Sequence, residues 1–332
     1  MNYNLLLDVR NLRTVFYTSD GVAPAVDGVT FSMKKGESLG IVGESGCGKS
    51  ITALSLMRLL PSPSGKIEDG QILFEGEDIL KKSETAMRKI RGKKISMIFQ
   101  EPMTSLNPVL TIGRQVSEAL EERQKLWQRY NMGKPIEWLK KVGISLPERR
   151  VLEYPHQMSG GMRQRIMIAM AISSNPRLLI ADEPTTALDV TIQAQILELM
   201  KNLKREFGMA ILMITHDFGV IAEMTERVLV MYAGKIVEEA RVEEILQDPK
   251  HPYTIGLLAS IPRIDEKKRR LHVIEGSVPN PSDFLTGCAF QPRCKYAQEI
   301  CLKHQPPLRA LNGTRHLSCW IGTSEYSEEA QL

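Results

Sequence analysis

The stretch Gly43-Glu44-Ser45-Gly46-Cys47-Gly48-Lys49-Ser50 decides the fold of this chain of 332 residues. It fits the pattern G-x-x-x-x-G-K-S and stands between an expected strand at Ser38 to Val42 and an apolar helix at Ile51 to Leu60, the context in which this pattern binds phosphate. Glycines let the loop turn its N–H groups toward an anion, and the following helix presents its positive end to the same anion. A glycine turn that only caps a helix is the simpler alternative, but it does not explain the preceding strand. We therefore expect Lys49 to contact terminal phosphates of a nucleotide and Ser50 to bind magnesium.

Strands and helices are expected to alternate up to about residue 240, which predicts an α/β fold with a largely parallel sheet. Besides Ser38 to Val42, the apolar runs Leu178 to Ala181 and Ala210 to Thr215 are predicted buried strands, and each ends in polar residues. Such strand ends mark the ligand crevice of an open parallel sheet. The segment from about 101 to 175 is mostly helical in pattern, including Gln115 to Gln128 and Met162 to Ser173. We interpret it as an inserted helical subdomain.

Two carboxylates and a histidine follow the second and third of these strands. Asp182 and Glu183 come directly after Leu178 to Ala181, and His216 follows Ala210 to Thr215. Beside a phosphate-binding loop, Asp182 is expected to hold magnesium and Glu183 to act as general base toward an attacking water. His216 is expected to contact the terminal phosphate or the water. Adjacent carboxylates can also be solvated turn residues, and a lone histidine is often structural.

A second glycine motif identifies a family. The run Ser159-Gly160-Gly161-Met162-Arg163-Gln164-Arg165 resembles the signature motif of ATP-binding cassette (ABC) ATPases. Gln100, Thr186-Ala187-Leu188-Asp189 and His216 are similar to the Q-loop, D-loop and H-loop of that family, in the same order. A kinase or GTPase would share the phosphate loop, but it would lack the signature motif. The resemblance implies a P-loop, RecA-like ABC ATPase core.

The resemblance also implies how ATP is bound. The signature of one subunit faces the P-loop of a second subunit, so two subunits pack head to tail around ATP. Counting four residues beyond Leu12 selects Phe16 as the residue that stacks on adenine, with Tyr17 as the alternative, although either can simply pack on a sheet. Glu183, His216 and Lys49 are the expected catalytic residues. The expected nucleotide-binding residues are Phe16, Tyr17, Gly43, Glu44, Ser45, Gly46, Cys47, Gly48, Lys49, Ser50, Ile51, Gln100, Asp182, Glu183, His216, Ser159, Gly160, Gly161 and Asp189, and those for magnesium are Ser50, Gln100 and Asp182.

Three further segments resemble one group within the family. The run from Gln100 to Pro108, the motif His251-Pro252-Tyr253-Thr254 and the run Leu257 to Pro262 are similar to the oligopeptide and dipeptide importer ATPases. This resemblance implies the motor subunit of a peptide importer at the cytoplasmic face of the membrane. Its partners would be a second ATPase subunit, identical or different, transmembrane permease subunits and, indirectly, an extracytoplasmic peptide-binding protein. A soluble ABC ATPase acting on nucleic acid or ribosomes is the alternative.

Length, proline frequency and charge predict how the chain is organised. At about 150 residues per domain, 332 residues predict about two folded units. Prolines become frequent after Asp248, so we predict a nucleotide-binding domain at 1–248 and an extension at 249–332. We expect neither an export leader nor a transmembrane helix, because charges interrupt every apolar run. A net charge of +4 is weak evidence for a polyanion surface, and no nucleic-acid partner is expected.

Most of the five cysteines lie in the extension. Cys288, Cys294, Cys301 and Cys319 are separated by 5, 6 and 17 residues, which predicts one shared metal site in a small irregular extension. The spacing is looser than the paired C-x-x-C of most four-thiolate zinc sites, so a four-iron four-sulfur cluster is favoured and zinc is the alternative. The stretches Gly287 to Cys294 and His316 to Trp320 resemble the cysteine-bearing tail of dipeptide importer ATPases, for which a cluster has been proposed.

Overall fold

The structure is a computed structural model of the whole chain. It describes residues 4–19, 21–100, 105–120, 132–186, 188–261, 273–279, 286–313 and 315–323. Contacts between Cα atoms divide the chain into two compact units. The first comprises Met1–Met33, Ser38–Leu80 and Ile214–Leu332, and the second comprises Lys34–Glu37 and Lys81–Met213. The extension after residue 248 thus belongs to the same unit as the P-loop.

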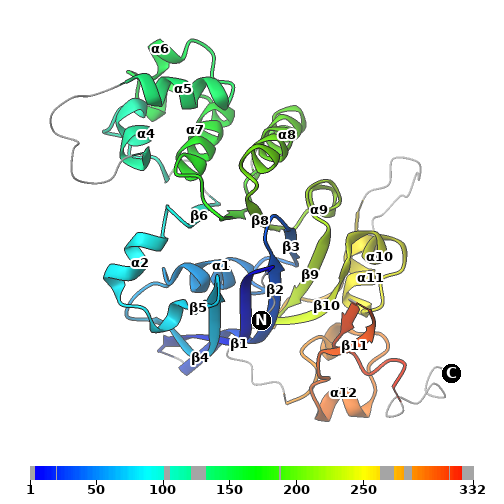
Figure 1. Cartoon of the computed structure of the whole chain (residues 1–332). Coiled ribbons are helices and arrows are strands. Elements are labelled where there is room, and N and C mark those ends of the chain that lie inside the picture. Colours follow the sequence, from blue (N-terminus) through cyan, green and yellow to red (C-terminus); the bar gives the residue numbers. More distant parts are fainter. Residues whose placement is uncertain are drawn as a thin grey trace. The chain divides into compact units, whose positions relative to one another are not determined.

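An antiparallel sheet in the first unit was not expected from the sequence. Its strand order is β2-β1-β4-β5, formed by β1 (Leu5–Thr18), β2 (Gly21–Lys34), β4 (Gly65–Phe74) and β5 (Glu77–Asp78) (Figure 1). The register of β1 on β4 pairs Leu7 with Phe74. The connections between β1 and β2 and between β4 and β5 are too short for the crossover that parallel strands need. These strands therefore pair antiparallel.

In the first unit, the P-loop follows β3, and β3 belongs to a sheet whose strands there have the order β11-β12-β10-β9-β3. The predicted strand at Ser38 to Val42 is confirmed as β3, which is buried at every position and runs parallel to β9 (Arg227–Tyr232). Then β10 (Lys235–Arg241) pairs antiparallel with β9. The helices of this unit are α1 (Lys49–Met57), α9 (Phe218–Met224), α10 (Val242–Gln247) and α11 (Pro252–Ala259). Helix α1 ends earlier than predicted because Arg58 turns into the left-handed region at φ 50°.

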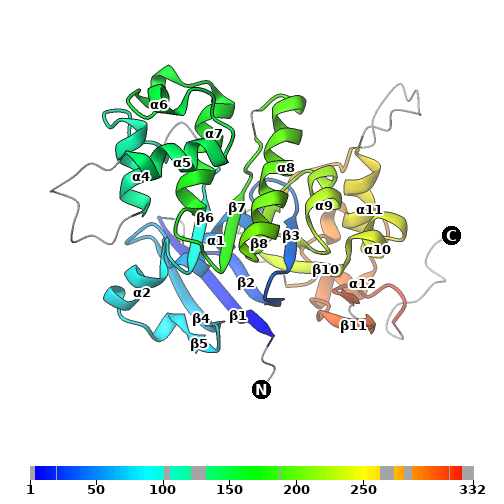
Figure 2. The same ribbon diagram turned by 45° about the horizontal axis from the view of Figure 1, so that its top comes forward.

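The second unit contains the predicted helical segment. Strand β6 (Ile95–Ile98) runs parallel to β7 (Leu178–Asp182), with Ile98 opposite Ala181. Helices α4 (Ile112–Leu120), α5 (Gly133–Lys141) and α7 (Gly160–Ile172) pack on one another, α6 (Pro147–Arg150) packs on α5, and Figure 2 shows the four as one group. The unit also contains α2 (Glu84–Ile90) and α8 (Val190–Phe207). The later part of the helix predicted at Gln115 to Gln128 lies outside the described residues.

The predicted strand at Ala210 to Thr215 is confirmed as β8, and the boundary between the two units falls within it. Within the described ranges, the longest and most apolar helices still fall short of what a membrane span requires.

The extension is more regular than predicted. It contains the helix α12 (Glu299–Lys303) and two strands, β11 (Arg309–Asn312) and β12 (Arg315–Leu317). Strand β12 pairs with β10, placing Leu317 opposite Glu238, and β11 pairs with β12. Strand β11 has four residues and β12 has three, so both are too short to show an alternating pattern in the sequence.

A buried ion pair joins the extension to the sheet. The side chain of Glu238 is 0% exposed, and its Oε1 accepts a hydrogen bond of 2.6 Å from Nη2 of Arg315, which is 4% exposed. The backbone N–H groups of Lys250 and His251 donate to the two carboxylate oxygens of Glu238, each at 2.9 Å. Because this carboxylate is out of water, it depends on all of these donors.

We expect Arg315→Ala to lower the free energy of opening of the extension by about 3–5 kcal/mol, because it leaves a buried carboxylate without its charged partner. Hydrogen exchange at the amides of β12 measures this opening. Lys303→Ala is the matched control: its ion pair with Glu299 is exposed on both sides, so its loss should leave the exchange close to that of the wild type. Equal exchange in the two variants would contradict the prediction.

Candidate nucleotide-binding site

The P-loop glycines lie against neighbouring backbone. A Cβ added at Gly43 would be 2.2 Å from the carbonyl oxygen of Met231, and one added at Gly48 would be 2.4 Å from the carbonyl oxygen of Ala25. Gly48 also has φ 103°, a conformation that favours glycine, and it directly precedes α1. These positions require glycine, and they hold the loop between β9, β2 and the first turn of α1.

The lysine of the P-loop is buried under the loop itself. Lys49 is 5% exposed, and its Nζ donates to the carbonyl oxygens of Gly43 and Glu44 at 2.8 and 2.9 Å. Ser45 and Gly46 are exposed at the tip, Ser50 and Ile51 are half-buried in α1, and Cys47 is buried. The structure therefore brings together every predicted residue of the loop from Gly43 to Ile51. Burial raises the pKa of the Cys47 thiol, so this residue stays protonated beside Lys49.

In the second unit, two of the predicted residues meet at the ends of β6 and β7. Nε2 of Gln100 donates to Oε2 of Glu183 at 3.1 Å, and Oγ1 of Thr186 donates to the same oxygen at 2.8 Å. Glu183 has φ 47°, an uncommon conformation for a residue with a side chain. Asp182, the last residue of β7, is buried. Strained residues gather at functional sites, and here the strain lies at the predicted base.

The signature residues form the start of α7. The Ser159 Oγ accepts a hydrogen bond from the N–H of Met162 at 3.3 Å, which makes Ser159 the N-cap of the helix. Gly160 is exposed and Gly161 half-buried. A Cβ at Gly161 would lie 2.8 Å from Cγ2 of Ile192 on α8, whereas one at Gly160 would only approach Leu188 at 3.8 Å. A helix N-terminus of this kind presents N–H groups that suit a phosphate.

The remaining predicted residues have clear local positions. Asp189 caps α8, since its Oδ1 accepts from the N–H of Ile192 at 2.9 Å. His216 is exposed and directly follows β8. Phe16 is half-buried on β1 opposite Gly65, while Tyr17 is exposed and donates from its hydroxyl to Glu68 at 2.9 Å. Ala187 of the predicted D-loop lies outside the described residues.

Two residues that touch the P-loop were not found from the sequence. The hydroxyl of Tyr253 accepts a hydrogen bond of 2.8 Å from the N–H of Glu44, and Arg293 forms an ion pair with the Glu44 side chain at 2.7 Å. They lie more than two hundred positions from the loop in the sequence. Tyr253 stands in the motif at 251–254 and Arg293 in the stretch Gly287 to Cys294, but neither pattern indicates a contact with the P-loop.

The structure brings the four cysteines of the extension together, yet it does not support the predicted metal site. Cys288, Cys294, Cys301 and Cys319 line one cavity of about 20 Å³ and are unpaired thiols. Such a cavity has room for about one water molecule, not for an iron–sulfur cube. In the described part of the chain no group of three or more His, Cys, Asp or Glu side chains is arranged to hold a metal ion. Burial raises the pKa of Cys288 to about 12 and of Cys319 to about 11, and a bound metal ion would lower both.

The P-loop, the strained glutamate after β7 and the glycine-rich start of α7, capped by Ser159, define an ABC-type ATPase, and comparisons with known proteins agree. The model of the ABC transporter family matches residues 26–186, and that of the oligopeptide/dipeptide transporter C-terminal region matches residues 237–301. The chain belongs to the ATP-binding proteins of ABC transporters, so the predicted membership and the predicted P-loop α/β fold are confirmed.

Among its relatives is the oligopeptide transport ATP-binding protein AppD of Bacillus subtilis (strain 168), 52% identical over 98% of this chain and 99% of that protein. The probable peptide ABC transporter ATP-binding protein y4tR of Sinorhizobium fredii is also 52% identical, over 96% and 95%. Among solved structures, the ATP-binding cassette MJ0796, a dimer in a post-hydrolysis state bound to ADP and Pi, superposes with a TM-score of 0.63 at 29% identity, covering 71% of this chain and 99% of that one.

We expect Gly161→Ala to destabilise the protein by about 1–3 kcal/mol, because the new methyl group overpacks against the branched carbon of Ile192. Gly160→Ala is the matched control, since its methyl group would meet only ordinary contacts. Urea denaturation compares the two variants. A larger loss in Gly160→Ala than in Gly161→Ala would contradict the packing seen here.

Proposed function

We propose that this chain is the ATP-binding and ATP-hydrolysing motor subunit of an ABC importer for dipeptides or oligopeptides. The observation that carries this proposal is the 52% identity to an oligopeptide transport ATP-binding protein over nearly the whole of both chains. The match to the oligopeptide/dipeptide transporter C-terminal region supports the same cargo class. A soluble ABC ATPase acting on nucleic acid or ribosomes is not favoured, because the relatives are named for peptide transport.

In this proposal the P-loop binds the phosphates of ATP. Its backbone N–H groups and the start of α1 receive the anion, and Lys49 leaves the carbonyl oxygens of Gly43 and Glu44 to contact the terminal phosphates. Ser50, Gln100 and Asp182 would hold magnesium, which neutralises charge on the phosphates when bound. Oxygen donors of this kind are what magnesium prefers. Phe16, or Tyr17 in its place, stacks on the adenine.

Glu183 is the proposed general base. Its Oε2 is held by Gln100 and Thr186, which fixes the direction of the carboxylate before it accepts a proton from water. The carboxylate takes a proton from the water that attacks the terminal phosphorus, while the bond from that phosphorus to the bridging oxygen breaks and ADP leaves. His216 contacts the terminal phosphate or this water.

Two ATPase subunits close around ATP in the proposed cycle. Ser159, Gly160 and Gly161 of one subunit contact the ATP held by Lys49 of the other, and Asp189 lies in the D-loop of the same contact. A dimeric relative bound to ADP and Pi supports this arrangement. The partner subunit is identical or a second ATPase. The functional division is a nucleotide-binding domain at 1–248, with a helical subdomain at about 101–175, and an extension at 249–332.

The subunit acts with membrane proteins. It sits peripherally at the cytoplasmic face of the membrane, where its closure drives the transmembrane permease subunits, while an extracytoplasmic peptide-binding protein delivers the cargo. The relatives support these partners, since their names place them in peptide transport and peptide import systems.

The finer proposal for the extension is a metal centre held by Cys288, Cys294, Cys301 and Cys319, a four-iron four-sulfur cluster or, in the alternative, zinc. It is supported by the four thiols around one cavity and requires them to move apart, because that cavity is about 20 Å³. Its role would be to hold the fold of the extension.

We expect Glu183→Gln to keep ATP affinity while lowering kcat by about 10²–10⁴-fold, because the amide cannot take the proton from water. Phosphate release under saturating ATP measures kcat. The exposed Glu223→Gln on α9 is the control and should retain wild-type turnover. Wild-type kcat in Glu183→Gln would overturn the assignment of the base.

Anaerobically purified protein tests the metal proposal. Iron and acid-labile sulfide at about four each per chain would support the cluster, and one zinc without sulfide would support the alternative. Replacing any one of the four cysteines with serine should lower bound metal, whereas Cys47→Ser should not. Metal content that is unchanged in all four single variants, or absent from wild type, would refute the metal centre.

A further inference from the structure

One residue of the P-loop connects the catalytic lysine to the extension. The Glu44 carbonyl oxygen accepts from Lys49, and its N–H donates to the hydroxyl of Tyr253 at 2.8 Å. Its side chain accepts two hydrogen bonds from Arg293, Nη1 to Oε2 at 2.7 Å and Nη2 to Oε1 at 2.9 Å. The Glu44 carbonyl oxygen also accepts from the N–H of Cys47 at 3.4 Å. Every polar group of Glu44 therefore has a partner, and two of its four partners come from residues after 248.

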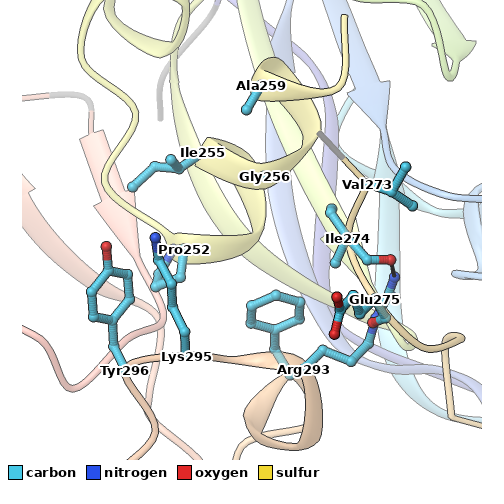
Figure 3. A pocket seen from close by; sticks show the side chains of 11 residues that line it. Pro252, Ile255, Gly256, Ala259, Val273, Ile274, Glu275, Arg293, Lys295 and Tyr296 are labelled. Atoms are coloured by element: carbon cyan, nitrogen blue, oxygen red, sulfur yellow. Dashed lines mark hydrogen bonds between the residues drawn. The ribbon is translucent and has the colours of Figure 1, made fainter. Parts of the chain in front are cut away.

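Arg293 lines a pocket and is held there by burial and hydrogen bonds. Its side chain is 4% exposed, and Nε and Nη2 donate to the carbonyl oxygens of Glu275 and Ile274 at 2.9 and 3.1 Å. The pocket has a volume of about 440 Å³. Figure 3 shows Arg293 directed toward these two residues, with α11 forming another wall of the pocket. Its guanidinium also lies 5.8 Å from the ring centre of Tyr232. The forked pair with Glu44 raises the pKa of Arg293 further, so it is always charged.

The segment that carries Arg293 also supports Tyr253. Phe290 is buried and packs its ring at 5.2 and 5.4 Å from those of Tyr232 and Tyr253. Phe290 and Arg293 both lie between Cys288 and Cys294. One short segment of the extension thus holds both of the contacts made to Glu44 from outside the loop.

Charge gives this contact a consequence for ATP. Glu44 places a carboxylate in a loop that receives a triphosphate, and like charges at short range repel strongly where solvent is partly excluded. Arg293 compensates this carboxylate with a forked ion pair, and it fixes the position of Glu44, from whose carbonyl oxygen Lys49 moves to reach a phosphate.

We propose that Arg293 is a positioning residue for nucleotide binding, which acts through Glu44 to orient the P-loop and to cancel the negative charge beside it. This inference rests on the proposed ATP-binding function. It makes the extension part of the nucleotide site rather than an appendage, because the P-loop takes its binding conformation only while the segment at 290–293 is docked.

The test is a double-mutant cycle on the full-length chain, with the affinity for Mg-ATP measured by calorimetry. Arg293→Ala should weaken binding by about tenfold, a difference of ~1.4 kcal/mol. Combining it with Glu44→Gln should restore most of the affinity, because the uncompensated charge is removed as well. Arg293→Lys keeps the charge but loses the fork, and its affinity should lie between those of wild type and Arg293→Ala. In turnover, KM for ATP should rise while kcat changes by less than about threefold.

Arg309→Ala is the matched control. Arg309 lies in the same extension and donates to the carbonyl oxygen of Ile321 at 3.2 Å, so its loss loosens the extension without removing a partner of Glu44, and ATP affinity should stay at the wild-type level. Wild-type affinity in Arg293→Ala, no recovery in the double variant, or equal weakening in Arg309→Ala would each overturn the positioning role. If Arg293→Ala does not fold, Arg293→Lys with wild-type affinity overturns it by itself. Absence of ATP binding in wild type would instead refute the proposed function, and this inference with it.

Discussion

The close approach of the P-loop backbone to neighbouring strands is the constraint on which the nucleotide side of the first unit depends. Gly43 lies against the carbonyl of Met231 on β9, and Gly48 lies against the carbonyl of Ala25 on β2, with no space for a Cβ at either position. The loop is therefore fixed at both ends by backbone, so the start of α1 has one position relative to β3. Lys49 can be buried beneath the loop because the carbonyl groups of the loop itself satisfy it.

The extension adds strands to the sheet that contains β10, and it also contacts the P-loop. Strand β12 lies on β10, and the buried carboxylate of Glu238 joins that edge to Arg315 and to the backbone before α11. Helix α11 then supplies Tyr253, whose hydroxyl and ring contact Glu44 and Phe290. Buried charges are costly without partners, so these contacts hold the extension in one arrangement. The four thiols share this part of the structure, where burial raises the pKa of Cys288 and of Cys319.

Much of the site is visible in the sequence because its chemistry is local. The strands at Ser38–Val42 and Ala210–Thr215 agree with their apolar runs, and Ser159 and Asp189 are N-caps, a role that depends on residues only three positions away. The meeting of Gln100 with Glu183 follows from two parallel strands that end at the same edge. The antiparallel sheet of β1, β2, β4 and β5 was not predicted, because the alternation of strands and helices along the rest of the sequence indicates a parallel sheet.

By itself, the sequence determined that the chain has a P-loop, two carboxylates at a strand end and a glycine signature, because each of these is encoded within a few consecutive residues. It also grouped the four cysteines, but not their geometry, and the predicted metal cage is not what the structure shows. Only the tertiary structure decided that Arg293 and Tyr253 meet Glu44 and that Arg315 meets Glu238. These contacts join positions 249, 209 and 77 residues apart, and no local propensity or spacing specifies such pairs. They form because folding removes water from polar and charged groups, which are then stable only when they are hydrogen-bonded to one another.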